Sequence, residues 1–158
     1  MSELSTERLE ASLERQLRWV AATESRIALI VPLATALFGS VAIKYHAFST
    51  VSSLVRFSCW AALILLSATI VFAAIAIFPR TKGPKRSLVF FGGIAGRTLS
   101  SFREEISVLS EADYRHDIVG QIHINARIAA IKYSWIKRSM MLLIFSLAPW
   151  ALSVAWLY

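Results

Sequence analysis

The residues best suited to binding an anion lie in one glycine-rich turn, Phe90-Phe91-Gly92-Gly93-Ile94-Ala95-Gly96-Arg97. Glycine lets backbone N–H groups approach an anion, and Arg97 can pair with a phosphate. Phe90 or Phe91 can stack on a base. This combination suits a nucleotide. A loop whose phenylalanines only pack on neighbouring helices explains the same residues, so both interpretations stay open.

A second polar set lies further along the chain among isoleucines: Gln121, Asn125, Lys132 and Tyr133. These side chains form a polar line beside an apolar face. A binding face and ordinary amphipathicity explain this pattern equally well.

A metal site is the weakest of the chemical possibilities. Asp113, His116, Asp117 and His123 lie within three turns, but the sequence offers no cysteine or third convergent ligand beside them. Acidic residues in a first helical turn are already favoured by the helix dipole. We therefore predict cap and surface roles for these residues, and no metal.

The sequence carries no motif for catalysis. It lacks Gly-x-Ser-x-Gly, Cys-x-x-Cys and Walker sequences. Its uncharged stretches contain no carboxylate, which argues against a proton-coupled transporter or a voltage sensor. We expect no enzyme and no resident cofactor.

Three uncharged stretches must position these residues: 27–43, 57–78 and 139–158. Each is about 17 to 22 residues long, which is enough to cross a bilayer as a helix. Apolar side chains run all round each stretch, and the whole chain is 56% hydrophobic and only 17% charged. The sequence predicts an all-α membrane protein with three transmembrane helices and cytoplasmic helical extensions.

The basic residues orient these helices. Four precede the first stretch, two lie in the 44–56 hairpin, and eleven lie within 79–138. The positive-inside rule places segments 1–26 and 79–138 in the cytoplasm, with the hairpin and the C-terminus outside. This topology accounts for the net charge of +7 without nucleic acid.

Two basic groups are expected at the membrane surface. Lys82, Lys85 and Arg86 follow the second span and can touch anionic lipid heads. Lys132, Lys137 and Arg138 precede the third span. Tyr133 and Trp135 lie beside them, which is typical of an interfacial anchor.

The cytoplasmic segments are expected to be helical. Residues 5–26 carry an apolar stripe and continue without a break into the first span. Leu9, Leu13, Leu17 and Val20 form that stripe. A short helix is predicted over residues 94–109. Ser110 with Asp113 resembles a capping box, so a long helix is expected from near Glu111 to the C-terminus.

Three stretches together resemble the Pycsar effector family, bacterial antiphage membrane proteins of the PycTM type. They are residues 13–20 with Glu24-Ser25-Arg26, residues 90–95, and residues 121–129 with Lys132-Tyr133. Their order and their placement relative to the spans resemble the family over most of the chain. One departure is Gly93, where the family commonly has an acid.

The resemblance implies a receptor for cyclic UMP or cyclic CMP, made by a partner cyclase during phage infection. Binding would impair the bacterial inner membrane and arrest growth, an abortive infection. The nucleotide is expected between the 90–97 turn and the cytoplasmic helices. The protein is expected to be an oligomer of identical chains. The residues expected to contact it are Phe90, Phe91, Gly92, Gly93, Arg97, Gln121 and Asn125.

Two other functions stay open. The chain can be a non-enzymatic scaffold subunit of a membrane complex, or a small constitutive pore. Neither requires a small-molecule ligand.

Overall fold

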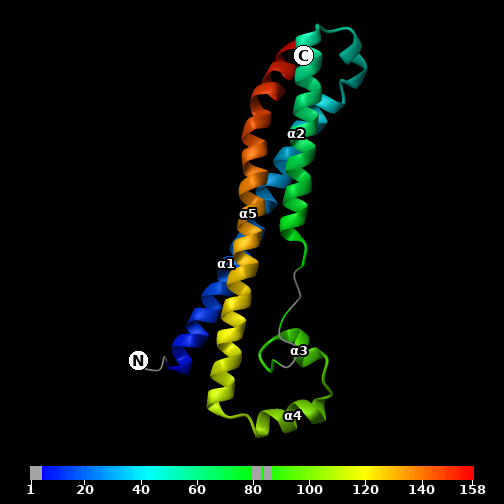
Figure 1. Ribbon diagram of the computed structural model, residues 1–158. Helices are drawn as coiled ribbons and strands as arrows, with labels where there is room; N and C mark the ends of the chain where they lie inside the picture. Colours follow the sequence, from blue (N-terminus) through cyan, green and yellow to red (C-terminus); the bar gives the residue numbers. More distant parts are fainter. Residues whose placement is uncertain (1–4, 80–82, 84–86) are drawn as a thin grey trace. The chain divides into compact units, whose positions relative to one another are not determined.

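A computed structural model of the protein describes residues 5–79, 83 and 87–158. All of the regular structure in these residues is helical, which confirms the predicted all-α class (Figure 1). The elements are α1 (Thr6–Ala42), the 3₁₀ helix η1 (Tyr45–Ser49), α2 (Ser53–Ile77), α3 (Phe91–Ala95), α4 (Leu99–Ser107) and α5 (Glu111–Leu157). The predicted lipid-contacting cluster of Lys82, Lys85 and Arg86 lies outside the described residues.

The chain forms two compact units. The first contains residues 1–22 and 79–130, and the second contains residues 23–78 and 131–158. Helices α1 and α5 contribute to both units, because the division falls within each of them.

Three helices are long and apolar enough to cross a membrane: α1, α2 and α5. This confirms the three predicted transmembrane helices. Helix α2 begins before the predicted 57–78 span, because Ser52 caps it by accepting a hydrogen bond from the Val55 N–H. Arg56 therefore lies in the first turn of α2 rather than in a loop.

The second unit is packed through a regular series of buried positions. These recur every three or four residues on α1 and α2 and every seven on α5, which is the spacing of helices packed as in a coiled coil. They are Thr23, Ile27, Ile30 and Ala34 on α1, Cys59, Ala62, Leu66, Thr69, Ala73 and Ala76 on α2, and Ser139, Ser146 and Ser153 on α5. Most are small, which allows close approach of helix backbones.

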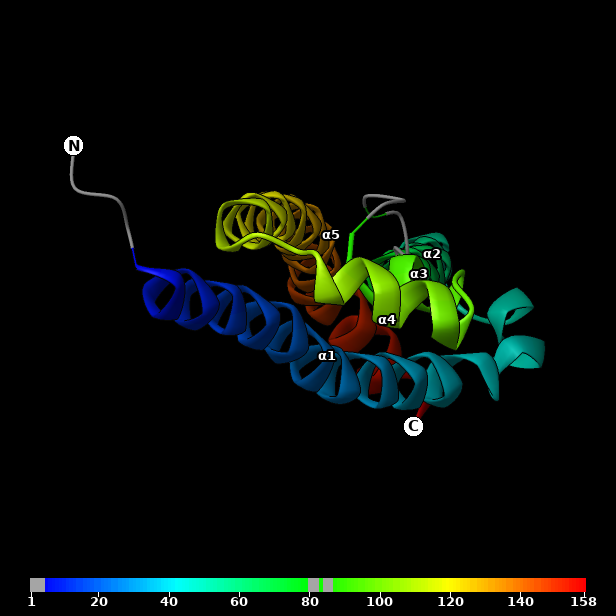
Figure 2. The same cartoon turned by 90° about the horizontal axis from the view of Figure 1, so that it is seen from below.

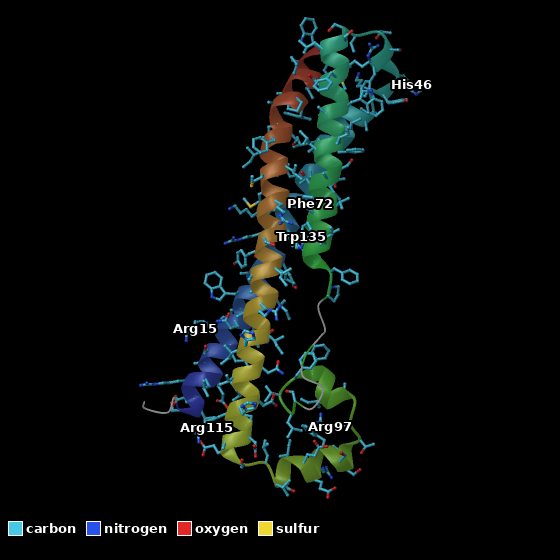
Figure 3. The ribbon with its side chains drawn as sticks, viewed as in Figure 1. Arg15, His46, Phe72, Arg97, Arg115 and Trp135 are labelled. Carbon is cyan, nitrogen blue, oxygen red and sulfur yellow. The ribbon has the colours of Figure 1, made fainter. Side chains whose placement is uncertain are left out.

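Specific contacts join α2 to α5 along this interface. The Ser139 hydroxyl donates to the Thr69 carbonyl oxygen at 2.9 Å. Nearby, the rings of Phe72 and Trp135 meet edge to face with centroids 5.3 Å apart (Figure 3). Polar and aromatic contacts therefore fix the register of two helices that are apolar on most sides.

The predicted 44–56 hairpin contains η1, which joins α1 to α2 (Figure 2). Phe48 is buried there, and its ring meets those of Tyr45 and Trp60. The hairpin is thus held by aromatic packing.

In the first unit, α1 starts at Thr6, one residue after the start of the predicted 5–26 helix, and its polar residues contact α5. The Thr6 hydroxyl donates to Glu111 and the Tyr114 hydroxyl donates to Glu10, both at 2.9 Å. The bond to Glu10, with smaller contributions from burial and nearby carboxylates, raises the pKa of Tyr114. The predicted apolar stripe is only partly covered, because Leu17 is 49% exposed.

The predicted helix over 94–109 is wrong, because this segment forms two helices, α3 and α4. Thr98 adopts an extended conformation between them and accepts a hydrogen bond from the Ser101 N–H, which starts α4 at Leu99. The predicted start of α5 is confirmed. Ser110 accepts from the Asp113 N–H at 3.1 Å, and α5 begins at Glu111.

Candidate functional site

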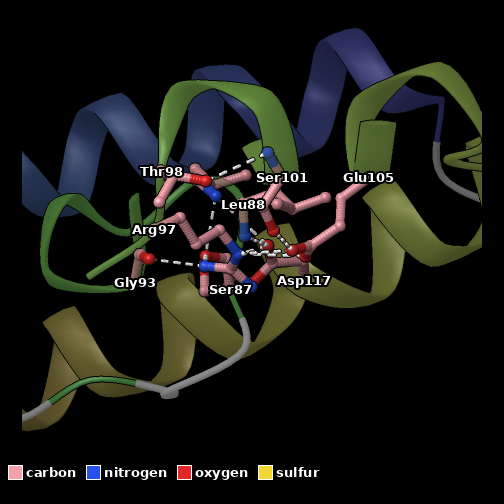
Figure 4. Close-up of polar contacts among 9 residues, drawn as sticks. Ser87, Leu88, Gly93, Arg97, Thr98, Ser101, Glu105 and Asp117 are labelled. Atoms are coloured by element: carbon pink, nitrogen blue, oxygen red, sulfur yellow. Dashed lines mark hydrogen bonds and ion pairs between the residues drawn. The ribbon is translucent and has the colours of Figure 1, made fainter. Parts of the chain in front are cut away.

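Ser87 fixes the backbone that leads into the 90–97 turn (Figure 4). Its side chain is buried, and its hydroxyl oxygen accepts hydrogen bonds from the N–H groups of Val89 and Phe90 at 3.1 and 2.8 Å. The Gln121 amide nitrogen donates to the same oxygen at 3.0 Å. Ser87 therefore links the start of the turn to α5.

Asp117 of α5 supplies a carboxylate to the same backbone. Its Oδ2 accepts from the Ser87 hydroxyl at 2.9 Å and from the N–H groups of Leu88 and Val89 at 2.8 and 3.3 Å. Hydrogen bonds to an ionised acceptor are stronger than neutral ones. The sequence indicated a cap or surface role for Asp117, and the structure shows that it caps the approach to the turn. These N–H groups already face an anion of the chain itself.

Arg97 is held by α4 and by the turn. Its Nε lies 2.9 Å from Oε2 of Glu105, and its Nη1 donates to the Ser87 carbonyl at 3.1 Å and to the Gly93 carbonyl (Figures 3 and 4). The Arg97 side chain is 12% exposed, whereas that of Glu105 is 42% exposed. The guanidinium is thus oriented within the loop, and the partner that balances its charge is half in solvent.

Gly93 is required by close packing. A Cβ atom at this position would lie 2.3 Å from the Ser87 carbonyl oxygen. No side chain fits there unless the backbone at residue 87 moves. In this chain an acid at position 93 is therefore incompatible with the observed path of the loop.

The two phenylalanines differ in exposure. Their ring centroids are 4.6 Å apart, and Phe91 is 62% exposed while Phe90 is half-buried. The Phe90 ring covers Gly92, where a Cβ would lie 2.6 Å from it. Phe91 is the aromatic surface that a ligand can reach.

The structure brings four of the seven predicted site residues together around Ser87. Phe90 and Gln121 bond to its hydroxyl, Arg97 bonds to its carbonyl, and Gly93 packs against that carbonyl. The other three are Phe91 and Gly92, which are exposed, and Asn125, whose amide donates to the carbonyl of Gln121 on its own helix at 2.9 Å.

Sequence reasoning missed Ser87 and Glu105. Ser87 has a recognisable signal, since a serine that accepts from the N–H groups two and three residues later is typical of a turn. Glu105 had no such signal, because its contact with Arg97 depends on the break between α3 and α4.

Within the described residues, no three His, Cys, Asp or Glu side chains are grouped so that they could hold a metal ion. The Asp113 carboxylate accepts a hydrogen bond from the Ser110 hydroxyl, and Asp117 makes the capping contacts described above.

Comparisons with known proteins cover nearly the whole chain. The family model described as "Pycsar effector protein domain" matches residues 8–158. A curated relative, Pycsar effector protein PtPycTM from Propioniciclava tarda, is 31% identical over 90 residues. That alignment covers 51% of this chain and 45% of the relative, so it spans less than half of the relative's length. No solved structure matches the chain.

Proposed function

Because the chain belongs to the Pycsar effector family, we propose that it is an antiphage receptor that binds cyclic UMP or cyclic CMP from a partner cyclase. It responds by impairing the inner membrane, and it is an effector rather than an enzyme. The observation that carries this proposal is that a single turn contains both an exposed aromatic ring, Phe91, and a guanidinium held in place by two carbonyl groups, that of Arg97. An aromatic face and a guanidinium match the base and the phosphate of a cyclic nucleotide.

Phe91 and Arg97 divide the recognition between them. Stacking of a base on an aromatic side chain contributes about 1–3 kcal/mol, and Phe91 can stack without first being uncovered. The guanidinium supplies charge-assisted hydrogen bonds to the phosphate. Gly92 beside Phe91 is exposed, although the Phe90 ring already lies against its Cβ position.

The phosphate replaces Glu105 as the partner of Arg97. Glu105 is 42% exposed, so its carboxylate returns to water at little cost, while the two carbonyl bonds from Arg97 keep the guanidinium oriented. Breaking the ion pair releases α4 from the turn. Binding thereby changes the contact that joins α3 to α4.

Helix α5 supplies the remaining contacts. Gln121 is buried and donates to the Ser87 hydroxyl, so it supports the turn from α5, while the half-buried Asn125 offers its amide to the edge of the pyrimidine. Gly93 contributes by allowing the close packing on Ser87.

Helix α5 also includes the third span, so the residues that read the ligand and a membrane helix share one element. A ligand shifts the population of arrangements only through different affinities for them. The responding unit is an oligomer of identical chains. The count of basic residues supports a cytoplasmic N-terminus and a periplasmic C-terminus.

Calorimetry on the detergent-purified full chain tests the proposal. Cyclic UMP or cyclic CMP is expected to bind, and Arg97→Gln and Phe91→Ala are each expected to weaken binding by at least about tenfold. Arg103→Gln is the matched control, since it removes an exposed charge from α4. Phe91→Ala removes an exposed ring, so its loss of binding cannot be attributed to unfolding. No heat with either nucleotide at millimolar concentration contradicts the proposal and favours a scaffold subunit.

A further inference from the structure

A cavity of about 350 Å³ opens between α1 and α5 within the second unit. That volume lies within the range of small-molecule sites. Its polar lining comes from Arg26, Tyr133 and Lys137, and its apolar lining includes Met140, Met141 and Ile144. These three apolar residues lie on the C-terminal side of Lys137 along α5, in the part of the helix that belongs to the third span, and Ile136 lines the cavity beside Lys137.

Arg26 and Lys137 both lie where their helices are expected to enter the membrane. Arg26 directly precedes the 27–43 stretch, and Lys137 lies just before 139–158. Ile27 and Ile136, their neighbours in sequence, belong to the same buried cluster. The two helices therefore place a positive charge at the same level of the bundle.

The charges of Arg26 and Lys137 are not balanced by carboxylates of the described residues. Nearby Lys132 differs, since its Nζ lies 3.1 Å from Glu24. The guanidinium of Arg26 lies over the Tyr133 ring, 5.2 Å from its centre. A cation on an aromatic face keeps its positive charge, so two charges remain at the opening of an apolar cavity.

A second cavity of the same volume provides a comparison. It lies against α1 and α2 and is lined by Glu24, Ile27, Val31, Pro32 and Ile77, among others. Its charged group is a carboxylate. Two basic residues therefore line the α1–α5 cavity, whereas none of the residues that line the cavity against α1 and α2 is basic.

We propose that the α1–α5 cavity binds one anionic phospholipid, for which phosphatidylglycerol is the test ligand. The phosphodiester lies between Arg26 and Lys137, and one acyl chain follows Met140, Met141 and Ile144. Basic pockets between membrane helices on the cytoplasmic side suit anionic head groups, and methionine adapts its shape to a flexible chain. The site is separate from the nucleotide turn, and the proposal does not rest on nucleotide binding.

Native mass spectrometry of the full chain released from vesicles tests the proposal. The vesicles contain equal amounts of phosphatidylglycerol and phosphatidylcholine with the same acyl chains. We expect one phosphatidylglycerol retained per chain in preference to phosphatidylcholine. The double variant Arg26→Gln, Lys137→Gln is expected to lower that preference at least about tenfold, because it removes both charge-assisted contacts.

Arg138→Gln is the matched control. Arg138 neighbours Lys137 but lies over the Trp135 ring, 4.7 Å from its centre, and does not line the cavity. This variant should retain the lipid. Met141→Trp keeps both cations and fills the cavity, so it should lose the lipid with normal helix content by circular dichroism.

Three results would overturn the proposal: equal retention of the two lipids, an unchanged preference in the double variant, or displacement of the lipid by millimolar inorganic phosphate. The last result identifies a site for free phosphate, because it shows that the acyl chain contributes nothing.

Discussion

In the first unit, the loop from Ser87 to Glu105 is held by side chains that reach across the chain. Asp117 and Gln121 bind Ser87, and Arg97 binds Glu105. In the second unit, most hydroxyl groups instead donate to a carbonyl of their own helix, as Ser58, Thr69 and Ser146 do. There the contacts between helices come mainly from small, buried side chains.

This difference predicts which unit changes more easily. A hydrogen bond near water contributes about 0.5–1.5 kcal/mol, because water or a ligand can replace either partner. Close packing of helices has no such replacement. In the proposed function, the loop is therefore the part that exchanges Glu105 for the phosphate of the ligand, and the packed spans keep their register when it does so.

The largest effect is expected from a substitution in the close-packed second unit. Leu66 is fully buried, and Leu66→Ala should destabilise the protein by about 2–5 kcal/mol. Thermal unfolding in detergent, followed by circular dichroism, measures the loss. Hydrogen exchange of the Leu88 and Val89 amides at low temperature should stay slow, since their acceptor Asp117 is unchanged. Faster exchange there would show that the loop depends on span packing.

Ser87→Ala should instead disrupt the hydrogen-bonded loop of the first unit. It removes the hydroxyl shared by Phe90, Gln121 and Asp117, and a buried polar group left without a partner costs about 1–3 kcal/mol. Faster amide exchange over residues 88–97 and weaker nucleotide binding are expected, with helix content unchanged. Ser146→Ala is the control, because that hydroxyl donates only within its helix. Equal effects of the two changes would remove the contrast between the units.

Gly93→Ala tests how tightly the loop is packed. The new Cβ would lie 2.3 Å from the Ser87 carbonyl, and overpacking of this kind costs about 1–3 kcal/mol. Gly120→Ala is the matched control in the same unit. Nothing lies within 4 Å of its Cβ position, so this change should stabilise α5 by up to about 1 kcal/mol. Thermal midpoints that move in the same direction would contradict the packing argument.

The helices could be predicted because length, charge and capping signals are local. The three spans follow from uncharged stretches, and the start of α5 follows from Ser110 and Asp113. The interface between spans was missed because apolar residues surround each helix. The spacing of seven between Ser139, Ser146 and Ser153 was its available signal.

The candidate site could be predicted only in part. Residue types identified the turn, but the path of the chain decides which side chains are used. Gly96 ends α3, Thr98 starts α4, and this break brings Glu105 to Arg97. Such a contact between two short helices has no periodic pattern in the sequence.

Glu105→Gln should have a smaller effect, and it should act on ligand affinity. The amide competes less strongly for Arg97, so cyclic nucleotide affinity is expected to rise severalfold, a gain of less than about 1.4 kcal/mol. Calorimetry measures the change. Glu104→Gln is the control, because Glu104 is an exposed neighbour on α4. A fall in affinity in Glu105→Gln alone would mean that the ion pair holds the loop in its binding conformation and does not compete with the ligand.

The smallest expected effect concerns Tyr114, whose hydroxyl donates to Glu10. That bond raises the pKa of Tyr114 above its ordinary value of 10.0. The bond therefore stabilises the first unit fully below that pH and is lost as the pH rises through the raised pKa. Carbon-13 NMR of labelled tyrosine, assigned with Tyr114→Phe, should show that Tyr114 ionises at a pH above 10.0, the ordinary pKa of tyrosine. Glu10→Gln should lower this pKa, since it removes the charged acceptor, while Glu14→Gln should leave it unchanged. An unaltered titration in Glu10→Gln would mean that burial, and not the contact between α1 and α5, raises the pKa.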